Sequence, residues 1–341
     1  MSKGRVRVCL VGAGRAGMVH GLNFRQALPE ADLVAVVDAD RSAAEASARN
    51  LSLQQGYTTL SEAAEKVPFE AVVIGAPTFV HCEVALEAAA LGKHILCEKP
   101  MATTLEECDS MAGAAQRAGV ILQLGFMRRF DRNFQLARTM VESGEIGEVT
   151  LVRSLTRGPG LPPPWYYDLR RSNGLLAEVN SHDCDTLRWF GGSEVEQVFA
   201  QAGAFYRPDI RAEHPDFYDC AVVNLRYASG RFGVIDGACP AEYGYDSRLE
   251  VVGTKGMVFV GQMHEENVVT CTKTSGVVRP IGASWRVKYR EAYLAEDRHF
   301  VDCVLKGDLP LVGAAEGRAA LAIVLAANRS IAEGVPVKLV G

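Results

Sequence analysis

The chain of 341 residues lacks any run of about 18 apolar residues, so no membrane-spanning helix is expected. Residues 1–5 lead straight into a strand-like segment, which argues against a signal peptide. The net charge of −5 gives no electrostatic reason to expect nucleic acid or an anionic membrane as a partner. We therefore expect a cytoplasmic protein without those partners.

Cys-x-x-Cys pairs are also absent, although the chain has nine cysteines. The cysteines are scattered through segments that are expected to be strands and helices. That distribution favours buried, reduced thiols, and it argues against both a disulfide framework and a metal site. The length allows two domains with a sizeable core.

The first third of the chain alternates strands and helices. A predicted strand over 5–11 runs directly into Gly-x-Gly-x-x-Gly, and a helix is predicted over 18–27. Gly12 permits the tight turn, Gly14 lets backbone N–H groups approach a pyrophosphate, and Gly17 permits close helix packing. The helix N-terminus adds positive partial charge. The expected phosphate-binding residues are Gly12, Ala13, Gly14, Arg15, Ala16 and Gly17.

A second predicted strand, over 33–37, ends at Asp38, about 20 residues beyond Gly17. A carboxylate at this place accepts hydrogen bonds from both ribose hydroxyls of NAD and repels the 2′-phosphate of NADP. The sequence therefore favours NAD over NADP. Arg41 is the residue that could instead serve a 2′-phosphate.

Three more strands are predicted over 71–74, 95–97 and 120–124, which makes the sheet parallel and doubly wound, a Rossmann domain. The loop after the first of them brings Ala76, Pro77 and Thr78 toward a nicotinamide ribose. His81 opens the next helix as either a cofactor contact or a packing histidine.

The next strand stops at Glu98-Lys99-Pro100 because proline cannot continue a sheet ladder. Ligands bind at the carboxyl edge of a parallel sheet, so Glu98 and Lys99 are candidates for the cofactor and substrate site. A surface lysine after an edge strand is the plainer interpretation of Lys99.

The second half changes character. After a helix-like segment over 127–142, strands of period two are predicted over 148–156, 195–202, 217–227, 231–237, 248–252 and 268–272. We expect residues 1–125 to form the Rossmann domain and residues 126–341 to form a mostly antiparallel α+β domain for substrate binding and oligomerisation. Two helices over 292–306 and 314–332 are candidates to pack back on the first domain. One face of the second sheet is expected to be buried in a homodimer or homotetramer.

A helix is predicted between Asn173-Gly174 and Gly191-Gly192, with Glu178, His182 and Asp185 on one face at i, i+4 and i+7. His182 can take a proton near neutral pH, and Glu178 can orient its ring. A satisfied helix histidine is the alternative. The preceding loop over 158–167 is stiff and aromatic, and its Trp165 lines either a pocket or an ordinary surface loop.

These motifs occur together in one family. Residues 12–17, 97–100, 125–131, 178–183, 243–246 and 250–256 stand in the order found in the Gfo/Idh/MocA (glucose–fructose oxidoreductase / inositol dehydrogenase) family. The chain resembles that family over essentially its whole length, and it is most similar to the myo-inositol 2-dehydrogenases.

The resemblance implies NAD(P)-dependent oxidation of a secondary hydroxyl on a polyol or sugar ring, with hydride passing to nicotinamide C4. Lys99 would hydrogen-bond the reacting oxygen, and His182 would be the general base. Glu178 stands where the family usually has aspartate, and it would orient His182 or bind a neighbouring hydroxyl. The other residues that the resemblance places near nicotinamide or substrate are Met127, Arg128 and Tyr245. Trp165, on the aromatic loop that does not resemble the inositol dehydrogenases, is a further candidate substrate contact.

Two other functions stay open. An enzyme that retains NAD could act through a transient keto sugar, as a sugar oxidoreductase, an epimerase or a hydrolase. A protein without catalysis could instead sense NAD. The presence of both Lys99 and His182 argues against the second alternative.

Overall fold

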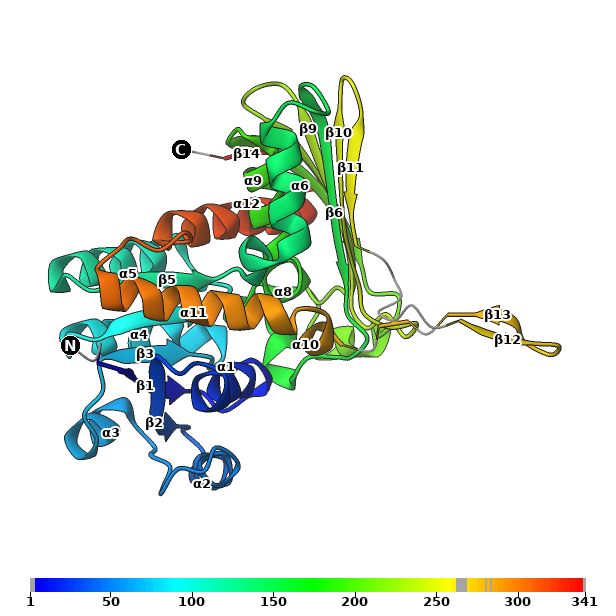
Figure 1. Cartoon of the computed structure of the whole chain (residues 1–341). Helices are drawn as coiled ribbons and strands as arrows, with labels where there is room; N and C mark the ends of the chain where they lie inside the picture. The colour runs from blue at the N-terminus through cyan, green and yellow to red at the C-terminus, as the bar shows by residue number, and fades with distance from the viewer. Residues whose placement is uncertain (1–3, 262–268, 280, 283, 340–341) are drawn as a thin grey trace. The chain divides into compact units, whose positions relative to one another are not determined.

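The computed structural model describes residues 4–261, 269–279, 281–282 and 284–339 (Figure 1). The chain divides into two compact units. The first unit combines Met1–Phe130 with Glu291–Arg318, and the second combines Asp131–Arg290 with Ala319–Gly341.

The first unit is built on a five-stranded parallel sheet in the order β2-β1-β3-β4-β5. Its strands are β1 (Val6–Val11), β2 (Ala31–Val37), β3 (Ala71–Ile74), β4 (His94–Glu98) and β5 (Leu122–Gly125). All five predicted strands are confirmed. The chain leaves β2 and passes across β1 to reach β3, so the order of the strands reverses between β1 and β3. In open α/β sheets, ligands bind outside the carboxyl ends of the strands at such a reversal.

Six helices accompany this sheet. They are α1 (Arg15–Gln26), α2 (Arg41–Asn50), α3 (Leu60–Lys66), α4 (His81–Ala90), α5 (Leu105–Ala118) and α11 (Arg290–Lys306). Helix α5 is capped at its N-terminus by Thr104, which forms a reciprocal capping box with Glu107, and at its C-terminus by Gly119 in the left-handed conformation. The core of the unit joins sheet residues such as Leu10 and Leu96 to Phe300 of α11.

The second unit contains a seven-stranded sheet in the order β11-β10-β6-β9-β8-β7-β14. Its strands are β6 (Val149–Arg157), β7 (Val195–Gly203), β8 (Cys220–Tyr227), β9 (Phe232–Ala238), β10 (Asp246–Gly253), β11 (Met257–Val260) and β14 (Val337–Lys338). Every pair is antiparallel except β6 with β9, which confirms the predicted mixed, mostly antiparallel α+β fold. The short edge strands β11 and β14 were not expected from the sequence.

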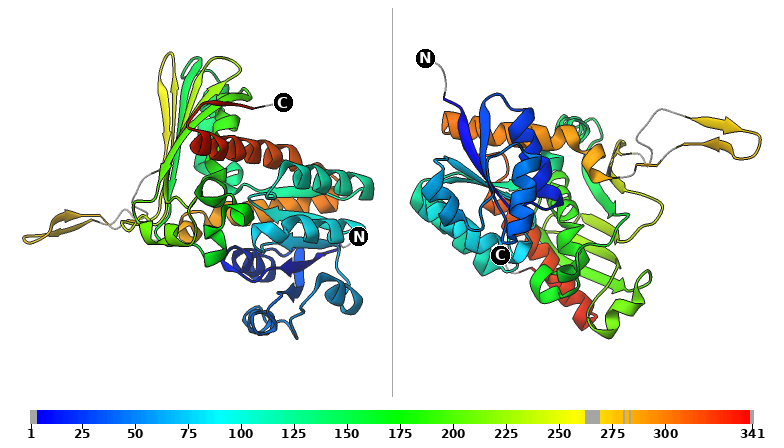
Figure 2. Two further views of the ribbon diagram at one scale, coloured as in Figure 1. Left: turned by 180° about the vertical axis from the view of Figure 1, so that it is seen from behind. Right: turned by 90° about the horizontal axis from the view of Figure 1, so that it is seen from below.

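Helices α6 (Arg132–Glu142), α8 (Gly174–Glu178), α9 (Ser181–Gly191) and α12 (Ala314–Glu333) lie on one face of this sheet (Figures 1 and 2). The alternation in β8 shows why: Ala221 and Val223 are buried, whereas Val222 and Asn224 are exposed. A separate hairpin of β12 (Thr270–Thr272) and β13 (Gly276–Val278) follows β11. The predicted strand over 268–272 begins at Val268, which lies outside the described residues.

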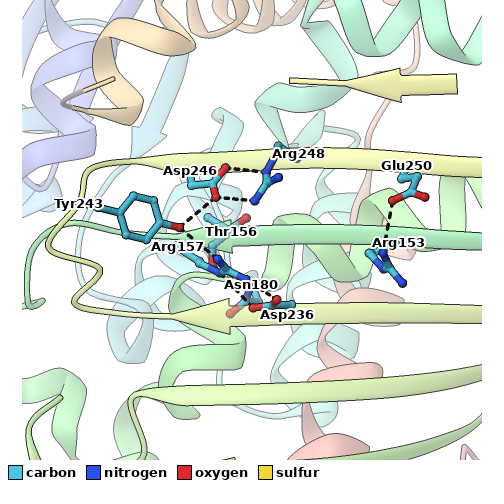
Figure 3. Close-up of polar contacts among 9 residues, drawn as sticks. All are labelled: Arg153, Thr156, Arg157, Asn180, Asp236, Tyr243, Asp246, Arg248 and Glu250. Carbon is cyan, nitrogen blue, oxygen red and sulfur yellow. Dashed lines mark hydrogen bonds and ion pairs between the residues drawn. The ribbon is translucent and has the colours of Figure 1, made fainter. Parts of the chain in front are cut away.

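The prediction of a single helix between Asn173-Gly174 and Gly191-Gly192 is wrong. Helix α8 ends at Glu178 and α9 starts at Ser181, so Glu178 does not share a helix face with His182 and Asp185. Asn180 stands at this break, and its fully buried amide donates to Asp183 Oδ2 (2.8 Å) and to the Thr156 carbonyl (3.4 Å; Figure 3). Asparagine is a poor residue for a helix interior because its side chain forms hydrogen bonds outside the helical pattern.

The helical segment predicted from Met127 is also interrupted. A 3-10 turn, η2, spans Met127–Phe130, and Asp131 then caps α6 by accepting the N–H groups of Asn133 and Phe134. The other 3-10 turns are η1 (Thr78–Val80), η3 (Pro164–Tyr167) and η4 (Pro208–Ala212), and two further short helices are α7 (Leu169–Ser172) and α10 (Trp285–Lys288).

The cysteines are all free, and Cys271 on β12 is the exposed one of the nine. Burial raises the pKa of the Cys97 and Cys184 thiols well above the ordinary value, so these side chains stay protonated and unreactive. The prediction of buried thiols is confirmed for six cysteines and wrong for Cys271, whereas Cys82 and Cys220 are half-buried.

Candidate active site

The glycine-rich turn after β1 is packed so tightly that it excludes side chains. Gly12 has φ +91°, and a Cβ there would overlap the backbone nitrogen of Ala76. A Cβ on Gly17 would overlap the Gly12 carbonyl oxygen, and one on Gly75 would come within 2.7 Å of the Gly17 Cα. The three glycines therefore let the turn, helix α1 and the loop after β3 lie in direct backbone contact.

Gly14 differs from its neighbours because the space above it is open. A Cβ there would find no other atom nearer than 4.0 Å, and Gly14 is the N-cap of α1. No side chain caps this helix and no acidic residue lies in its first turn, so the first N–H groups face outward with positive partial charge. Arg15 is exposed, whereas Ala16 is half-buried. This cradle fits a pyrophosphate.

Asp38 follows β2 directly and lies against the glycine-rich turn. Its Oδ2 accepts the Ala13 N–H (3.0 Å), and its Oδ1 accepts the Asp40 N–H (3.0 Å). Strands β1 and β2 are neighbours, with Val11 opposite Val37, which brings the acid to the edge of the turn. The carboxylate is half-buried and stands where the ribose of a bound dinucleotide is expected.

The loop after β3 contains Ala76, half-buried, Pro77, exposed, and Thr78, buried. His81 opens α4 and lies inside the fold, where Nε2 is 2.8 Å from the Ala76 carbonyl oxygen and Nδ1 is 2.9 Å from that of Pro100. Burial lowers the pKa of His81, although both carbonyl groups act in the opposite sense. The ring thus ties the loop after β3 to the loop after β4. A direct cofactor contact by His81 stays a prediction.

The end of β4 carries Glu98 and Lys99. The Glu98 carboxylate is buried, and its Oε2 accepts the Lys99 backbone N–H (2.9 Å). Burial raises the pKa of Glu98, but the hydrogen bond from His20 and the charges of His20 and Lys99 outweigh it, so the net shift is downward. Lys99 itself is half-buried at the carboxyl edge of the sheet.

Residues 127 and 128 follow β5 on the 3-10 turn η2. Met127 and Arg128 are both buried, and Arg128 is only 1% exposed. The five strands of the first unit therefore end in the glycine-rich turn, Asp38, the 76–78 loop, Glu98-Lys99 and η2, in the arrangement that the sequence predicted.

In the second unit, His182 lies in the first turn of α9 and is 5% exposed. The next residue, Asp183, is fully buried and accepts hydrogen bonds from Ser154 (2.5 Å) and Thr156 (2.7 Å) of β6 and from Asn180 (2.8 Å). The two donors of β6 attach the start of α9 to the sheet, and Asn180 adds a bond within the turn before the helix, so the backbone at His182 is held in place. Sequence reasoning missed this function of Asp183.

The remaining candidates of the second unit lie on separate segments. Glu178 ends α8 and is half-buried, and Trp165 is half-buried on η3. Tyr245 precedes β10, is buried, and packs edge-on against Tyr289 with ring centroids 6.3 Å apart. The neighbouring Tyr243 hydroxyl donates to Asp246 Oδ2 (2.9 Å) and accepts from Arg157 (3.2 Å; Figure 3).

His20 and Asp297 were also missed, although they lie directly behind Glu98. The His20 ring reaches both Glu98 and Asp297. A sequence signal existed: Glu296 and Asp297 interrupt the apolar stripe of α11 between Tyr293 and Phe300, and both are fully buried.

The described part of the chain lacks two features that would change the kind of site expected. No group of three or more His, Cys, Asp or Glu side chains there is arranged to hold a metal ion. No helix in that part of the chain is both long and apolar enough to cross a bilayer.

Comparison with known proteins gives a consistent match. Residues 6–126 match the family described as an oxidoreductase family with an NAD-binding Rossmann fold, and residues 134–259 match the GFO/IDH/MocA C-terminal domain. The myo-inositol 2-dehydrogenase of Thermotoga maritima is 35% identical over 334 residues, which cover 98% of each protein.

Two further relatives agree. The scyllo-inositol 2-dehydrogenase (NAD(+)) of Bacillus subtilis is 32% identical over 98% of this chain and 96% of its own. The crystal structure of myo-inositol 2-dehydrogenase from Lactobacillus plantarum matches with a TM-score of 0.92 at 27% identity, over 98% of this chain and 100% of that one. The nucleotide cradle, the Glu98-Lys99 strand end and these matches agree, and the chain belongs to the Gfo/Idh/MocA family of NAD-dependent oxidoreductases that act on CH–OH groups.

Proposed function

We propose that the protein oxidises a secondary ring hydroxyl of a cyclitol of the inositol type, with NAD as the hydride acceptor. The observation that carries the proposal is that the similarity to named inositol dehydrogenases extends through both units, so it includes the substrate-binding half of the chain. Polyols of this class carry several secondary hydroxyls. Which ring carbon is oxidised depends on the contacts that the substrate makes.

Lys99 is proposed to donate a hydrogen bond to the reacting oxygen. Its place at the carboxyl edge of β4, next to the loop after β3, supports this role because ligands bind at that edge. An ammonium there stabilises negative charge that develops on the oxygen as the hydroxyl proton leaves.

His182 is proposed to take the hydroxyl proton as a general base. The ring is nearly buried, and Asp183 holds the first turn of α9 by three hydrogen bonds, so the imidazole is fixed in position. A positioned base contributes about 10²–10⁴-fold to such a rate. The carbon loses a hydride and the oxygen loses a proton, which leaves a ketone and a protonated His182.

Bound NAD supplies the hydride acceptor, and the residues of the first unit are suited to hold it. The open cradle at Gly14 receives the pyrophosphate, and Asp38 accepts the ribose hydroxyls. Asp40 lies close to Asp38 and adds a second negative charge beside the position of a 2′-phosphate. This arrangement favours NAD over NADP, even though Arg41 is the first residue of α2.

Glu178 is proposed to bind a substrate hydroxyl rather than to orient His182 from the same helix face. The break at Val179-Asn180 separates the two residues into different helices. Trp165, Tyr245, Met127 and Arg128 remain proposed contacts of substrate or nicotinamide.

The test is a panel of myo-, scyllo- and chiro-inositol with common hexoses, assayed by the absorbance of NADH at mildly alkaline pH. Stoichiometric NADH formation with at least one inositol supports the proposal. Turnover of a sugar without net NADH would instead favour a retained cofactor and a transient keto sugar. NAD binding without any turnover would leave only a sensing function.

We also propose that a second copy of this chain covers the open face of the seven-stranded sheet. The strand register places four exposed apolar side chains on that face: Val222, Phe232, Met257 and Phe259. The charged side chains between them are already paired (Figure 3). Arg153 pairs with Glu250 and Arg157 with Asp236 across strands, and Arg248 pairs with Asp246 along β10. A self-paired, partly apolar face can meet an identical face without leaving a lone buried charge.

Sedimentation velocity tests the second-copy proposal. Phe232→Lys with Met257→Lys should shift the protein to a smaller species, whereas Leu309→Lys in the first unit should not, because Leu309 is 89% exposed in a different unit. If the wild-type protein sediments as a monomer, assembly through this face is contradicted. The same holds if the double variant keeps the sedimentation coefficient of the wild type.

A further inference from the structure

A chain of polar contacts runs through the interior of the first unit behind Lys99. Glu98 Oε2 accepts the Lys99 backbone N–H (2.9 Å), and Glu98 Oε1 lies 3.2 Å from His20 Nε2. The other ring nitrogen, His20 Nδ1, lies 2.6 Å from Asp297 Oδ1, and Asp297 Oδ2 accepts the Asn23 amide (2.8 Å). The side chains of His20, Glu98 and Asp297 are 5% exposed or less.

Two carboxyl groups therefore contact one imidazole. An ionised carboxylate only accepts, so both ring nitrogens must donate unless one acid is protonated. Burial lowers the pKa of His20, but the charges and hydrogen bonds of Asp297 and Glu98 hold it well above its ordinary value. Burial raises the pKa of Asp297, whereas that of Glu98 is lowered, so Glu98 is the carboxylate held more firmly in its ionised form.

The other groups around His20 are neutral. Tyr293 of α11 meets the ring edge-on, with centroids 5.4 Å apart. Glu296 of α11 is fully buried, and its two carboxyl oxygens have no hydrogen-bond partner in the described part of the chain. Burial, and then the charge of Glu98, raise the pKa of Glu296 well above its ordinary value, so it is an uncharged acid. The charges that act on the ring are those of Asp297 and Glu98.

We propose that Glu98, His20 and Asp297 form a positioning relay for Lys99, in which a buried imidazolium keeps the Glu98 carboxylate ionised and aligned beside the lysine. The proposal rests on the proposed role of Lys99 at the reacting oxygen. A structural role alone explains the relay poorly, because buried ionic groups are often no more stabilising than apolar residues of similar volume.

The relay has a defined chemical effect. The Glu98 carboxylate fixes the backbone of Lys99 through its N–H and places a negative charge beside the residue whose ammonium is proposed to donate to the reacting oxygen. His20 and Glu98 favour each other's charged forms, so the negative charge persists through the neutral range. The relay holds only while His20 keeps its proton. If either acid partner is weakened, His20 loses that proton at a lower pH and the alkaline limb of kcat/KM moves down.

The test compares pH profiles of kcat/KM at saturating NAD. Glu98→Gln keeps the shape of the side chain and an acceptor for the Lys99 N–H but removes the charge. We expect its alkaline limb to fall by about one pH unit, with a shift in the same direction in Asp297→Asn and no such limb in His20→Asn. Glu296→Gln is the matched control, on the same helix as Asp297. Replacing an uncharged acid by an amide there should leave the alkaline limb in place.

Several outcomes would overturn the relay. Wild-type alkaline limbs in active Glu98→Gln and His20→Asn would show that it does not act on Lys99. A large loss of NAD affinity with an unmoved limb would assign Glu98 to cofactor binding instead. If His20→Asn fails to fold, the limb of Glu98→Gln decides alone. Full activity of Lys99→Met would contradict the role of the lysine itself, whereas an inactive Lys99→Met with unmoved limbs elsewhere contradicts only the relay.

Discussion

In the first unit the candidate residues follow the ends of five parallel strands, whereas in the second unit they lie on short helices and loops beside a mixed sheet. Backbone topology alone brings the first set together, because neighbouring parallel strands end at one edge. The second set depends on particular side chains, above all on Asp183, which fastens α9 to β6. The position of Lys99 therefore follows from the strand order, whereas the position of His182 depends on a single buried carboxylate.

The largest expected effect concerns the chemical step itself. Lys99→Met and His182→Asn should each lower kcat by about 10³-fold, because one removes the stabiliser of the oxygen and the other the base. The affinity for NAD, measured by fluorescence titration, should stay within a few-fold. A near-wild-type kcat in Lys99→Met or in His182→Asn would contradict the catalytic role proposed for that residue.

Gly17→Ala should nearly abolish NAD binding and lower stability by about 3 kcal/mol, since the new methyl group overlaps the Gly12 carbonyl. Calorimetry of NAD binding and thermal melting measure the two effects. The control is Gly113→Ala in α5, where the Cβ would meet only the flexible end of Arg117 (3.0 Å). That change should be neutral or mildly stabilising.

Asp183→Asn should destabilise the second unit by about 2 kcal/mol, because an amide cannot accept all three hydrogen bonds. We also expect kcat to fall about tenfold as α9 loosens around His182. Asp209→Asn, which changes an exposed ion pair with Arg207, should move the melting temperature little. An Asp183 variant as stable and active as the control would remove the proposed contrast between the units.

Asp38→Ala should reduce the preference for NAD over NADP by about tenfold or more, since it removes the ribose acceptor and the repulsion of a 2′-phosphate. The ratio of kcat/KM for the two cofactors measures it. Asp40→Ser keeps a cap on α2 and serves as the comparison. A ratio that stays at the wild-type value would assign selectivity to another residue.

The smallest expected effect is a change of stability with pH in His20→Asn. The pKa of His20 is raised on folding, so its contribution is fully present below the ordinary imidazole value and is lost as pH rises through the folded value. The difference in melting temperature between wild type and variant should therefore narrow toward alkaline pH. A difference that widens there would mean that the ring is uncharged in the folded protein.

The sequence predicted the first unit closely because its signals are local. Strand, Gly-x-Gly-x-x-Gly turn, helix and acid follow one another, and each residue type has a backbone reason to be there. The second unit was harder. Asn180 at the helix break donates to the carbonyl of Thr156, which lies on a strand far away in the chain, and no periodicity shows such a contact.

The same difference explains the missed residues. His20 and Asp297 are separated by most of the chain, and their pairing depends on tertiary packing. Asp183 looked like one of several acids on a helix, and only the donors of β6 distinguish it from Asp185. The short strands β11 and β14 lacked a period long enough to recognise.

The exposure of Cys271 has a practical consequence. A thiol-reactive dye added under mild conditions should modify this cysteine first, because burial protects the buried ones and keeps their sulfur protonated. The hairpin of β12 and β13 thus offers a built-in attachment point for a fluorescent reporter. Energy transfer between labelled copies would then test the proposed second-copy assembly without any engineered cysteine.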